Sequence, residues 1–227
     1  MNDIEKIFAG LGGQFITPFT EFRKKAVSIK AFVFDWDGVF NSGIKVSEDG
    51  SPFSEPDSMG LNMLKLNYWL LKKTIPPTFI ITGENNKTAL RFARRENMNA
   101  VFLSYKDKTE ALDFICKEHG LKKEETAFVF DDILDIGVAA KAGLSFLVDH
   151  PGSPLTKDFI ISNGICDYVT GNTGGGEAVR EVCELLIGTT GDMHRTIDTR
   201  IRFKGDYEKY LKEKSCIETQ LFRYEKH

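Results

Sequence analysis

The sequence predicts an α/β protein with a central parallel sheet, and three observations lead to this fold class. Short apolar runs such as Ala31–Phe34 and Thr126–Phe130 lack polar alternation, which indicates strands buried on both faces. Segments of helical length and pattern separate these runs, as expected when helices cover both faces of a parallel sheet. Polar residues follow several of the runs, where open parallel sheets bind their ligands.

The elements can be assigned in chain order. Residues 3–9 form a short amphipathic helix that a run of glycines ends, and the basic trio at 23–25 is expected in a solvated approach to the first strand. Strands are predicted over residues 31–34, 79–81, 100–103, 126–130, 144–148 and 167–170. Helices are predicted over residues 57–72, 87–96, 107–119, 154–163 and 177–187, with another that ends near residue 143.

Alternating residues around Asp49 and Gly50 predict a β-hairpin over about residues 44–53. Pro52 marks its returning arm as an edge strand, because proline cannot donate to a ladder. A hairpin that projects from a small domain favours an interface between subunits, with a surface flap as the alternative.

The bulk composition narrows the class of protein. The chain has 227 residues with 30 basic and 33 acidic side chains, a formal net charge of -3. This balance argues against nucleic acid or an anionic membrane as the main partner. We find no signal-peptide pattern and no apolar run of membrane length, and the four cysteines are widely spaced. We therefore expect a soluble, cytoplasmic protein whose cysteines stay reduced.

Length and pattern suggest one main domain with two appendages. Residues 1–28 are an N-terminal extension, residues 29–188 carry the alternating pattern, and residues 189–227 form a charge-rich tail. The tail is expected to hold a helix near residues 204–217, and either to pack on a neighbouring subunit or to be largely disordered.

The first strand ends in two carboxylates, Asp35 and Asp37, and Gly38 then allows a sharp turn. One carboxylate can act as a nucleophile while the second exchanges protons. With a cation that prefers oxygen ligands, this pair is suited to phosphoryl transfer. The alternative is an ordinary polar turn.

Three further strand ends carry groups that suit the hydrolysis of a phosphate monoester. Thr82 can hold phosphate oxygens, Lys108 supplies a positive charge, and Asp131 with Asp135 can help to bind a cation. Each group alone has a structural explanation, as a helix cap, a solvated charge or first-turn acids. Their joint occurrence at successive strand ends favours the catalytic interpretation.

In order and spacing, these residues resemble the haloacid dehalogenase (HAD) superfamily over residues 28–188. Within it the sequence is similar to the uncapped phosphatases of 3-deoxy-D-manno-octulosonate 8-phosphate and their nonulosonate relatives. The resemblance is carried by residues 34–39, 49–50, 57–61, 107–108, 131–135 and 174–182. Only about forty residues separate Asp37 from the next strand, which leaves no room for a lid domain.

The resemblance implies a three-layer, Rossmann-like fold without a cap, and an aspartyl-phosphate intermediate. Asp35 would be the nucleophile and Asp37 the general acid/base. Thr82 and Lys108 would hold the phosphoryl group. Magnesium would be bound by Asp35, the backbone carbonyl of Asp37, and Asp131. Asp132 and Asp135 would support these groups, and the substrate would contact Gly83, Glu84 and Asn85.

The resemblance also implies a phosphorylated sugar acid as substrate, in biosynthesis of the lipopolysaccharide or sialic-acid type. It further implies a homotetramer in which the hairpins of the subunits assemble and neighbouring subunits cover each active site. Glu84 stands where the octulosonate 8-phosphate enzymes commonly have Arg. A Glu at this position resembles the nonulosonate 9-phosphate branch instead. The same feature occurs in phosphatase-like domains joined to acylneuraminate cytidylyltransferases. The alternative function is therefore a scaffold or regulatory domain that partners a nucleotide-sugar enzyme.

Overall fold

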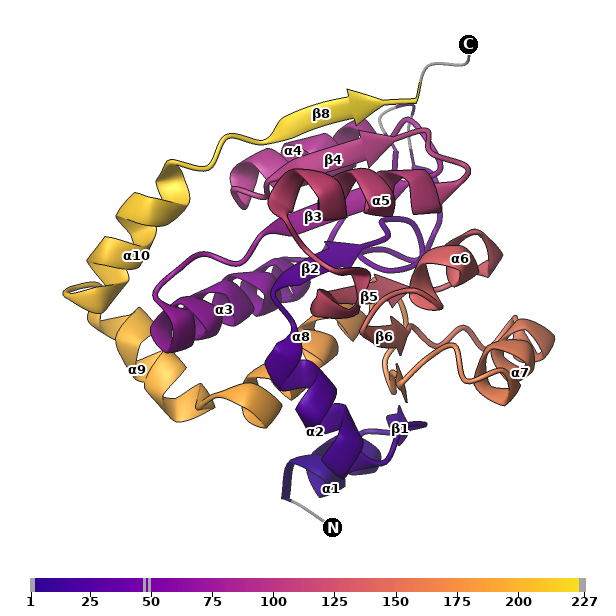
Figure 1. Cartoon of the computed structure of the whole chain (residues 1–227), viewed down its shortest axis with the longest axis horizontal. Coiled ribbons are helices and arrows are strands. Elements are labelled where there is room, and N and C mark those ends of the chain that lie inside the picture. The colour runs from indigo at the N-terminus through magenta and orange to yellow at the C-terminus, as the bar shows by residue number, and fades with distance from the viewer. Residues whose placement is uncertain (1–2, 47, 49, 225–227) are drawn as a thin grey trace.

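The computed structural model describes residues 3–46, 48 and 50–224, and in them a central sheet lies between two layers of helices (Figure 1). The strand order is β1-β7-β6-β5-β2-β3-β4-β8, and all neighbours are parallel except β1 and β7. The strands are β1 (Gln14–Phe15), β2 (Ala31–Phe34), β3 (Thr78–Thr82), β4 (Ala100–Leu103), β5 (Thr126–Phe130), β6 (Leu144–Leu147), β7 (Tyr168–Val169) and β8 (Gln220–Arg223). The predicted α/β class is confirmed.

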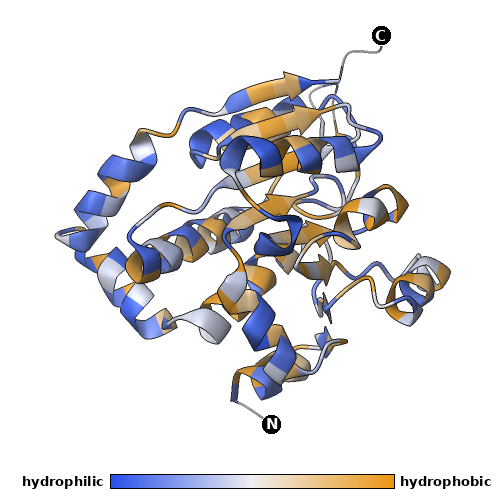
Figure 2. Ribbon diagram, viewed as in Figure 1, coloured by the Kyte–Doolittle hydropathy of each residue, from blue (hydrophilic) through white to orange (hydrophobic). Residues whose placement is uncertain are grey.

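Alternate side chains of β2 face the two helical layers. Phe32 and Phe34 pack in the cluster formed with α2 (Phe19–Ser28), α3 (Glu55–Lys72), α4 (Lys87–Arg95) and α8 (Ala178–Thr190). Ala31 and Val33 pack in the cluster formed with α5 (Lys108–His119), α6 (Ile136–Ala139) and α7 (Pro154–Ser162). Because both faces of the strand are buried, its residues are uniformly apolar, as Figure 2 shows for the centre of the sheet.

Near the N-terminus, α1 (Asp3–Gly10) is formed as expected, whereas α2 replaces the predicted solvated approach to the first strand. Phe19, Phe22 and Ala26 lie on one face of α2 and are buried, while the basic residues occupy its other face. Lys25 pairs with Asp167 through a contact of 2.6 Å between Nζ and Oδ1. The helical spacing of the apolar residues was present in the sequence, but the basic trio obscured it.

The hairpin predicted over residues 44–53 is not formed by the described residues, none of which lies in a strand. Ser47 and Asp49 lie outside the described residues. An isolated two-stranded hairpin is marginally stable in water, and Ile44 and Val46 are 67% and 69% exposed in this single chain. The apolar side chains therefore have no surface of their own chain to pack against.

The tail packs on its own chain, in contrast to both alternatives expected from the sequence. Helices α9 (Met193–Arg202) and α10 (Asp206–Ser215) lie along α3, and β8 then extends the sheet beside β4. Tyr210 is buried against the ring of Trp69, and Phe222 stacks on Phe102 with ring centroids 4.8 Å apart. A few aromatic anchors thus order a charge-rich segment.

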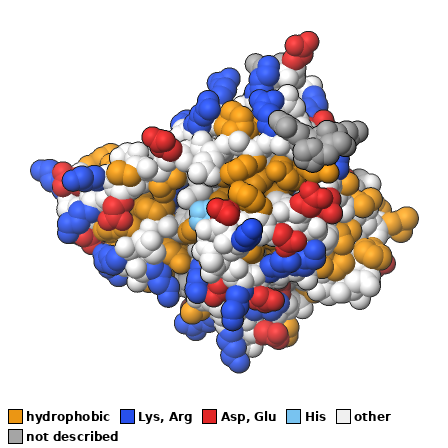
Figure 3. All heavy atoms as spheres, turned by 45° about the horizontal axis from the view of Figure 1, so that its top comes forward, with side chains coloured by type: hydrophobic (Ala, Val, Ile, Leu, Met, Phe, Trp, Pro, Cys, Tyr) orange, Lys and Arg blue, Asp and Glu red, His pale blue; other side chains and the backbone are white. Residues whose placement is uncertain are grey.

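Acidic, basic and apolar side chains are interspersed on the face shown in Figure 3, so no single sign of charge dominates it. None of the helices in the described ranges combines the length and apolar character that crossing a bilayer requires.

One lysine lies in the core of the helical layer. Lys65 of α3 is fully buried, and its Nζ donates to the backbone carbonyls of Glu96 (3.0 Å) and Asn97 (2.8 Å). These carbonyls end α4, where a positive charge is favourable. Burial nevertheless lowers the pKa of Lys65 to about 7, with a further lowering from Lys214.

This shift predicts a pH-dependent stability. Between about pH 7 and the unfolded-state pKa, the unfolded chain binds the Lys65 proton more tightly, so the wild type gains stability as pH rises. Relative to Lys65→Met, we expect the free energy of unfolding of the wild type to increase by roughly 3 kcal/mol from about pH 7 to about pH 9.5, as measured by urea denaturation. Lys117→Met, at an exposed position of α5, should follow the wild type. Parallel curves for wild type and Lys65→Met would refute the prediction.

Candidate active site

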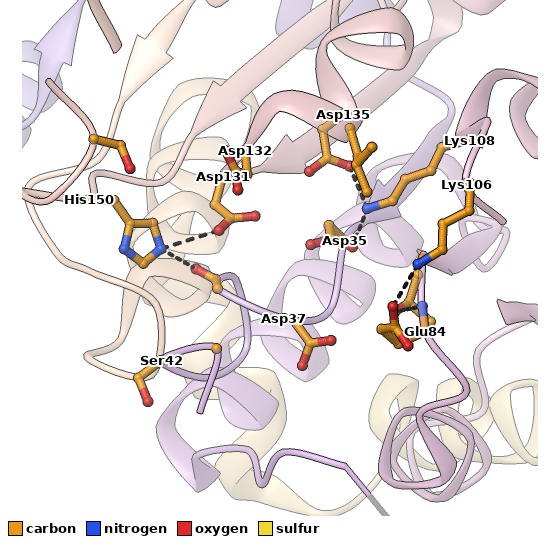
Figure 4. Close-up of a pocket in the computed structure, with 16 residues that line it drawn as sticks. Asp35, Asp37, Ser42, Glu84, Lys106, Lys108, Asp131, Asp132, Asp135 and His150 are labelled. Atoms are coloured by element: carbon orange, nitrogen blue, oxygen red, sulfur yellow. Dashed lines mark hydrogen bonds and ion pairs between the residues drawn. The ribbon is translucent and has the colours of Figure 1, made fainter. Parts of the chain in front are cut away.

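The carboxyl ends of neighbouring strands bring the predicted residues to one edge of the sheet. Asp35 follows β2, Thr82 ends β3, Lys108 begins α5 after β4, and Asp131 follows β5. These residues line one open cavity of about 390 Å³ (Figure 4). The convergence follows from topology, since adjacent parallel strands end on the same side.

Lys108 lies between two carboxylates at the bottom of the cavity. Its Nζ donates to Asp35 Oδ1 and, at 2.5 Å, to Asp135 Oδ1, and all three side chains are buried. Burial alone would lower the pKa of Lys108, but the two carboxylates raise it, so the ammonium stays charged. Burial raises the pKa of Asp35 and takes that of Asp135 to about 6, while Lys108 opposes both shifts.

A group of carboxylates suitable for a cation lies beside this lysine. Oxygen atoms of Asp35, Asp131 and Asp135 lie within 4.8 Å of one another. Carboxylate oxygens are the ligands that hard cations such as Mg²⁺ prefer. Asp131 also meets His150, whose Nε2 lies 3.3 Å from Asp131 Oδ2. The pKa of His150 is raised by this contact.

Glycines shape the loop that follows β2. Gly38 has a φ of +80°, and a Cβ built there would collide with the carboxylate of Asp131. Gly174, in the run before α8, packs against the backbone carbonyl of Gly38 so closely that its own Cβ would also collide. The glycine-rich run therefore supports the loop after β2 by backbone-to-backbone packing.

The side chain of Asp37 points away from the carboxylate group and is held by three donors (Figure 4). Ser51 Oγ donates to Oδ1 at 2.9 Å, while Lys45 Nζ and Asn86 Nδ2 donate to Oδ2 at 2.6 and 2.7 Å. Asn86 Nδ2 also lies 2.8 Å from Thr82 Oγ1. Asn86 thus links the two strand ends of β2 and β3, although the sequence analysis did not select it.

The remaining predicted residues divide into two groups. Gly83, Glu84 and Asp132 line the cavity, but Asn85 is exposed and does not. The N-cap position of Asn86 was a usable signal: its side chain makes no bond to its own helix and turns into the site instead. Other lining residues that the sequence analysis did not select are Ser42, Gly43, Lys106, Leu134, His150 and Ser153.

No protein-family model matches the chain. Among curated proteins, the chain is 29% identical over 175 residues to the 3-deoxy-D-manno-octulosonate 8-phosphate phosphatase KdsC of Escherichia coli, covering 74% of this chain and 85% of that protein. The same-named protein of Salmonella typhi is 29% identical over 180 residues, 77% of this chain and 87% of its own.

Solved structures agree with these relatives. A 3-deoxy-D-manno-octulosonate 8-phosphate phosphatase from Moraxella catarrhalis, in complex with a magnesium ion, a phosphate ion and a KDO molecule, has a TM-score of 0.67 and 29% identity, covering 80% of this chain and 98% of that chain. A structure from Legionella pneumophila, assigned to subfamily III A of the HAD hydrolases, has a TM-score of 0.68 and 26% identity. The match covers 81% of this chain and 95% of that chain.

These findings confirm the predicted resemblance at the level of the superfamily and of its octulosonate-phosphatase-like members. In sequence and in structure, the chain is therefore similar to hydrolases of the haloacid dehalogenase superfamily, and among them to the 3-deoxy-D-manno-octulosonate 8-phosphate phosphatases.

Proposed function

We propose that the protein is a magnesium-dependent phosphatase that hydrolyses the phosphate monoester of a sugar acid. The observation that carries the proposal is the buried carboxylate of Asp35, paired with Lys108 at the bottom of a cavity that Thr82 also lines. The names of the similar proteins, which act on 3-deoxy-D-manno-octulosonate 8-phosphate, support this substrate class.

The donor set fits a magnesium ion. Asp35, the backbone carbonyl of Asp37, and Asp131 would hold it, and the close group of carboxylates supplies the oxygen ligands that such an ion prefers. When bound, the ion neutralises charge that would otherwise repel the nucleophile from the substrate.

The chemistry needs two displacements at phosphorus. A carboxylate oxygen of Asp35 forms a bond to phosphorus while the bond from phosphorus to the ester oxygen breaks, and Asp37 gives a proton to the departing alkoxide. Asp37 then takes a proton from water, whose oxygen attacks phosphorus and releases Asp35 with inorganic phosphate. The three donors around Asp37 keep its carboxylate on the side of the cavity where the leaving group departs.

The other groups hold the phosphoryl oxygens and the nucleophile in place. Thr82 contributes its hydroxyl and Gly83 its backbone amide, while the Lys108 ammonium offsets negative charge on the transferred group. Asp135 fixes the lysine through its bond of 2.5 Å, and Asp132 also lines the cavity.

The substrate is proposed to be an octulosonate 8-phosphate or a nonulosonate 9-phosphate. Both carry a phosphate ester at one end of the chain and a carboxylate at the other. Glu84 stands at the cavity rim with its side chain 59% exposed, where it can accept hydrogen bonds from sugar hydroxyls.

We also propose that residues 44–53 form an interface in a homotetramer, because Ile44 and Val46 expose apolar surface next to the site. Replacing both by Asp should convert the assembly to single chains, measured as molar mass by light scattering. Leu155→Asp, at an apolar position of α7 that is 84% exposed, is the control and should leave the mass unchanged. A wild-type mass equal to one chain would contradict the assembly.

The catalytic proposal is tested by Asp35→Asn. We expect magnesium-dependent phosphate release from octulosonate 8-phosphate to fall by at least about 10³-fold, because the amide cannot attack phosphorus. Acid-quenched mass spectrometry should find phosphate on residue 35 of the wild type and none on the variant. Asp158→Asn, at an exposed position of α7, should retain full activity. Turnover that persists in Asp35→Asn, or a folded wild type that releases no phosphate from any ulosonate phosphate, would reject the proposal.

The adjacent pair Asn85 and Asn86 tests how the general acid/base is positioned. Asn86→Ala removes the bonds to Asp37 and Thr82, and we expect kcat to fall about tenfold to a hundredfold with a smaller change in KM. Asn85→Ala removes an exposed side chain that does not line the cavity, and should match the wild type. Equal effects of the two substitutions would show that Asn86 has no positioning role.

A further inference from the structure

Two lysines line the cavity in the described part of the chain, and they differ in environment. Lys108 is buried and already bound by Asp35 and Asp135. Lys106 has its side chain 65% exposed and pairs with Glu84 through a contact of 2.6 Å between Nζ and Oε1. Its positive charge therefore faces the open part of the cavity.

Lys106 stands beside the strand end that would hold the phosphoryl group. Its Nζ lies 3.8 Å from the position that a Cβ of Gly83 would occupy, and Leu134 Cδ1 lies 3.6 Å from the same position. Because Gly83 directly follows Thr82, the Lys106 ammonium lies close to the residues that are proposed to hold the phosphate. In the view of Figure 4, Lys106 lies on the side of the cavity opposite His150.

The acidic lining of the cavity makes a cation useful for binding a substrate that carries a carboxylate. A carboxylate entering the site would be repelled by the acidic side chains of the lining, which are Asp35, Asp37, Glu84, Asp131, Asp132 and Asp135. Two nearby basic side chains are already engaged with carboxylates: Lys45 contacts Asp37 and the ring of His150 contacts Asp131. Lys106 is held by Glu84 instead, at the rim.

We propose that Lys106 is the specificity residue that binds the carboxylate of the sugar acid, with the substrate replacing Glu84 as its partner. The exchange is feasible because exposed ion pairs contribute little to stability, whereas a cation partly shielded by substrate binds a carboxylate more strongly. Glu84, once released, can accept hydrogen bonds from the hydroxyl groups of the same molecule. This inference rests on the proposed function and names the group that recognises its substrate class.

The experiment compares two substrates that differ in one charge: octulosonate 8-phosphate and its carboxyl methyl ester. For Lys106→Met we expect kcat/KM to fall about tenfold on the acid, mainly through KM, with little change on the ester. Lys106→Arg should restore most of the preference for the acid, since it keeps the charge. p-Nitrophenyl phosphate, which has no carboxylate, should be hydrolysed equally by wild type and both variants.

Calorimetry with free 3-deoxy-D-manno-octulosonate and the magnesium-loaded protein provides a second readout that needs no turnover. Weaker binding to Lys106→Met, restored in Lys106→Arg, would support the inference. Equal losses on acid and ester, or unchanged binding, would overturn it and leave the phosphatase proposal intact. A wild type that hydrolyses none of the phosphate esters would reject the phosphatase proposal, while calorimetry would still decide whether Lys106 binds the carboxylate.

Discussion

The site depends on the ion pairs that the ammonium group of Lys108 makes with Asp35 and Asp135. Two buried carboxylates, Asp35 and Asp135, could not stay ionised side by side without a cation between them, because removal from water costs several kcal/mol per charge. The three residues come from the end of β2, the start of α5 and the segment after β5. One ion cluster therefore holds three parts of the chain at a single point, and the charge of Lys108 opposes the rise in the pKa of Asp35 that burial causes.

A second constraint is that glycines, which have no side chain, are needed where the loop after β2 meets the loop before α8. The carbonyl of Gly38 lies against Gly174, and the carboxylate of Asp131 occupies the space where a Gly38 side chain would stand. The glycines thus allow the carboxylate of Asp131, the loop that carries Asp37 and the loop before α8 to share a small volume. The contact between Gly174 and Gly38 is stiff, because it joins backbone to backbone. The inner part of the site is consequently fixed by the fold itself.

The sequence was sufficient to predict what local pattern and topology determine. Apolar runs identified the strands, and parallel order then required Asp35, Thr82 and Asp131 to converge. Features decided by tertiary contacts were not predictable in this way. Asn86 was missed because its side chain turns away from the helix that it begins, and the order of the tail depends on the docking of aromatic residues such as Phe222. The predicted hairpin is absent from the described residues because a single chain gives it nothing to pack against.

The division between a fixed interior and an open rim suggests how specificity is distributed in a site without a lid. The groups proposed to bind phosphate are buried and mutually bonded, so changing one of them disturbs the others. Lys106 and Glu84 are exposed and bonded chiefly to each other, so their replacement leaves the interior untouched. Differences in the leaving group are most easily read by such exposed pairs, because the exchange of one ionic partner for another there costs little. Under the proposed function, the strand ends would therefore carry the chemistry, and the residues around the opening would select the substrate.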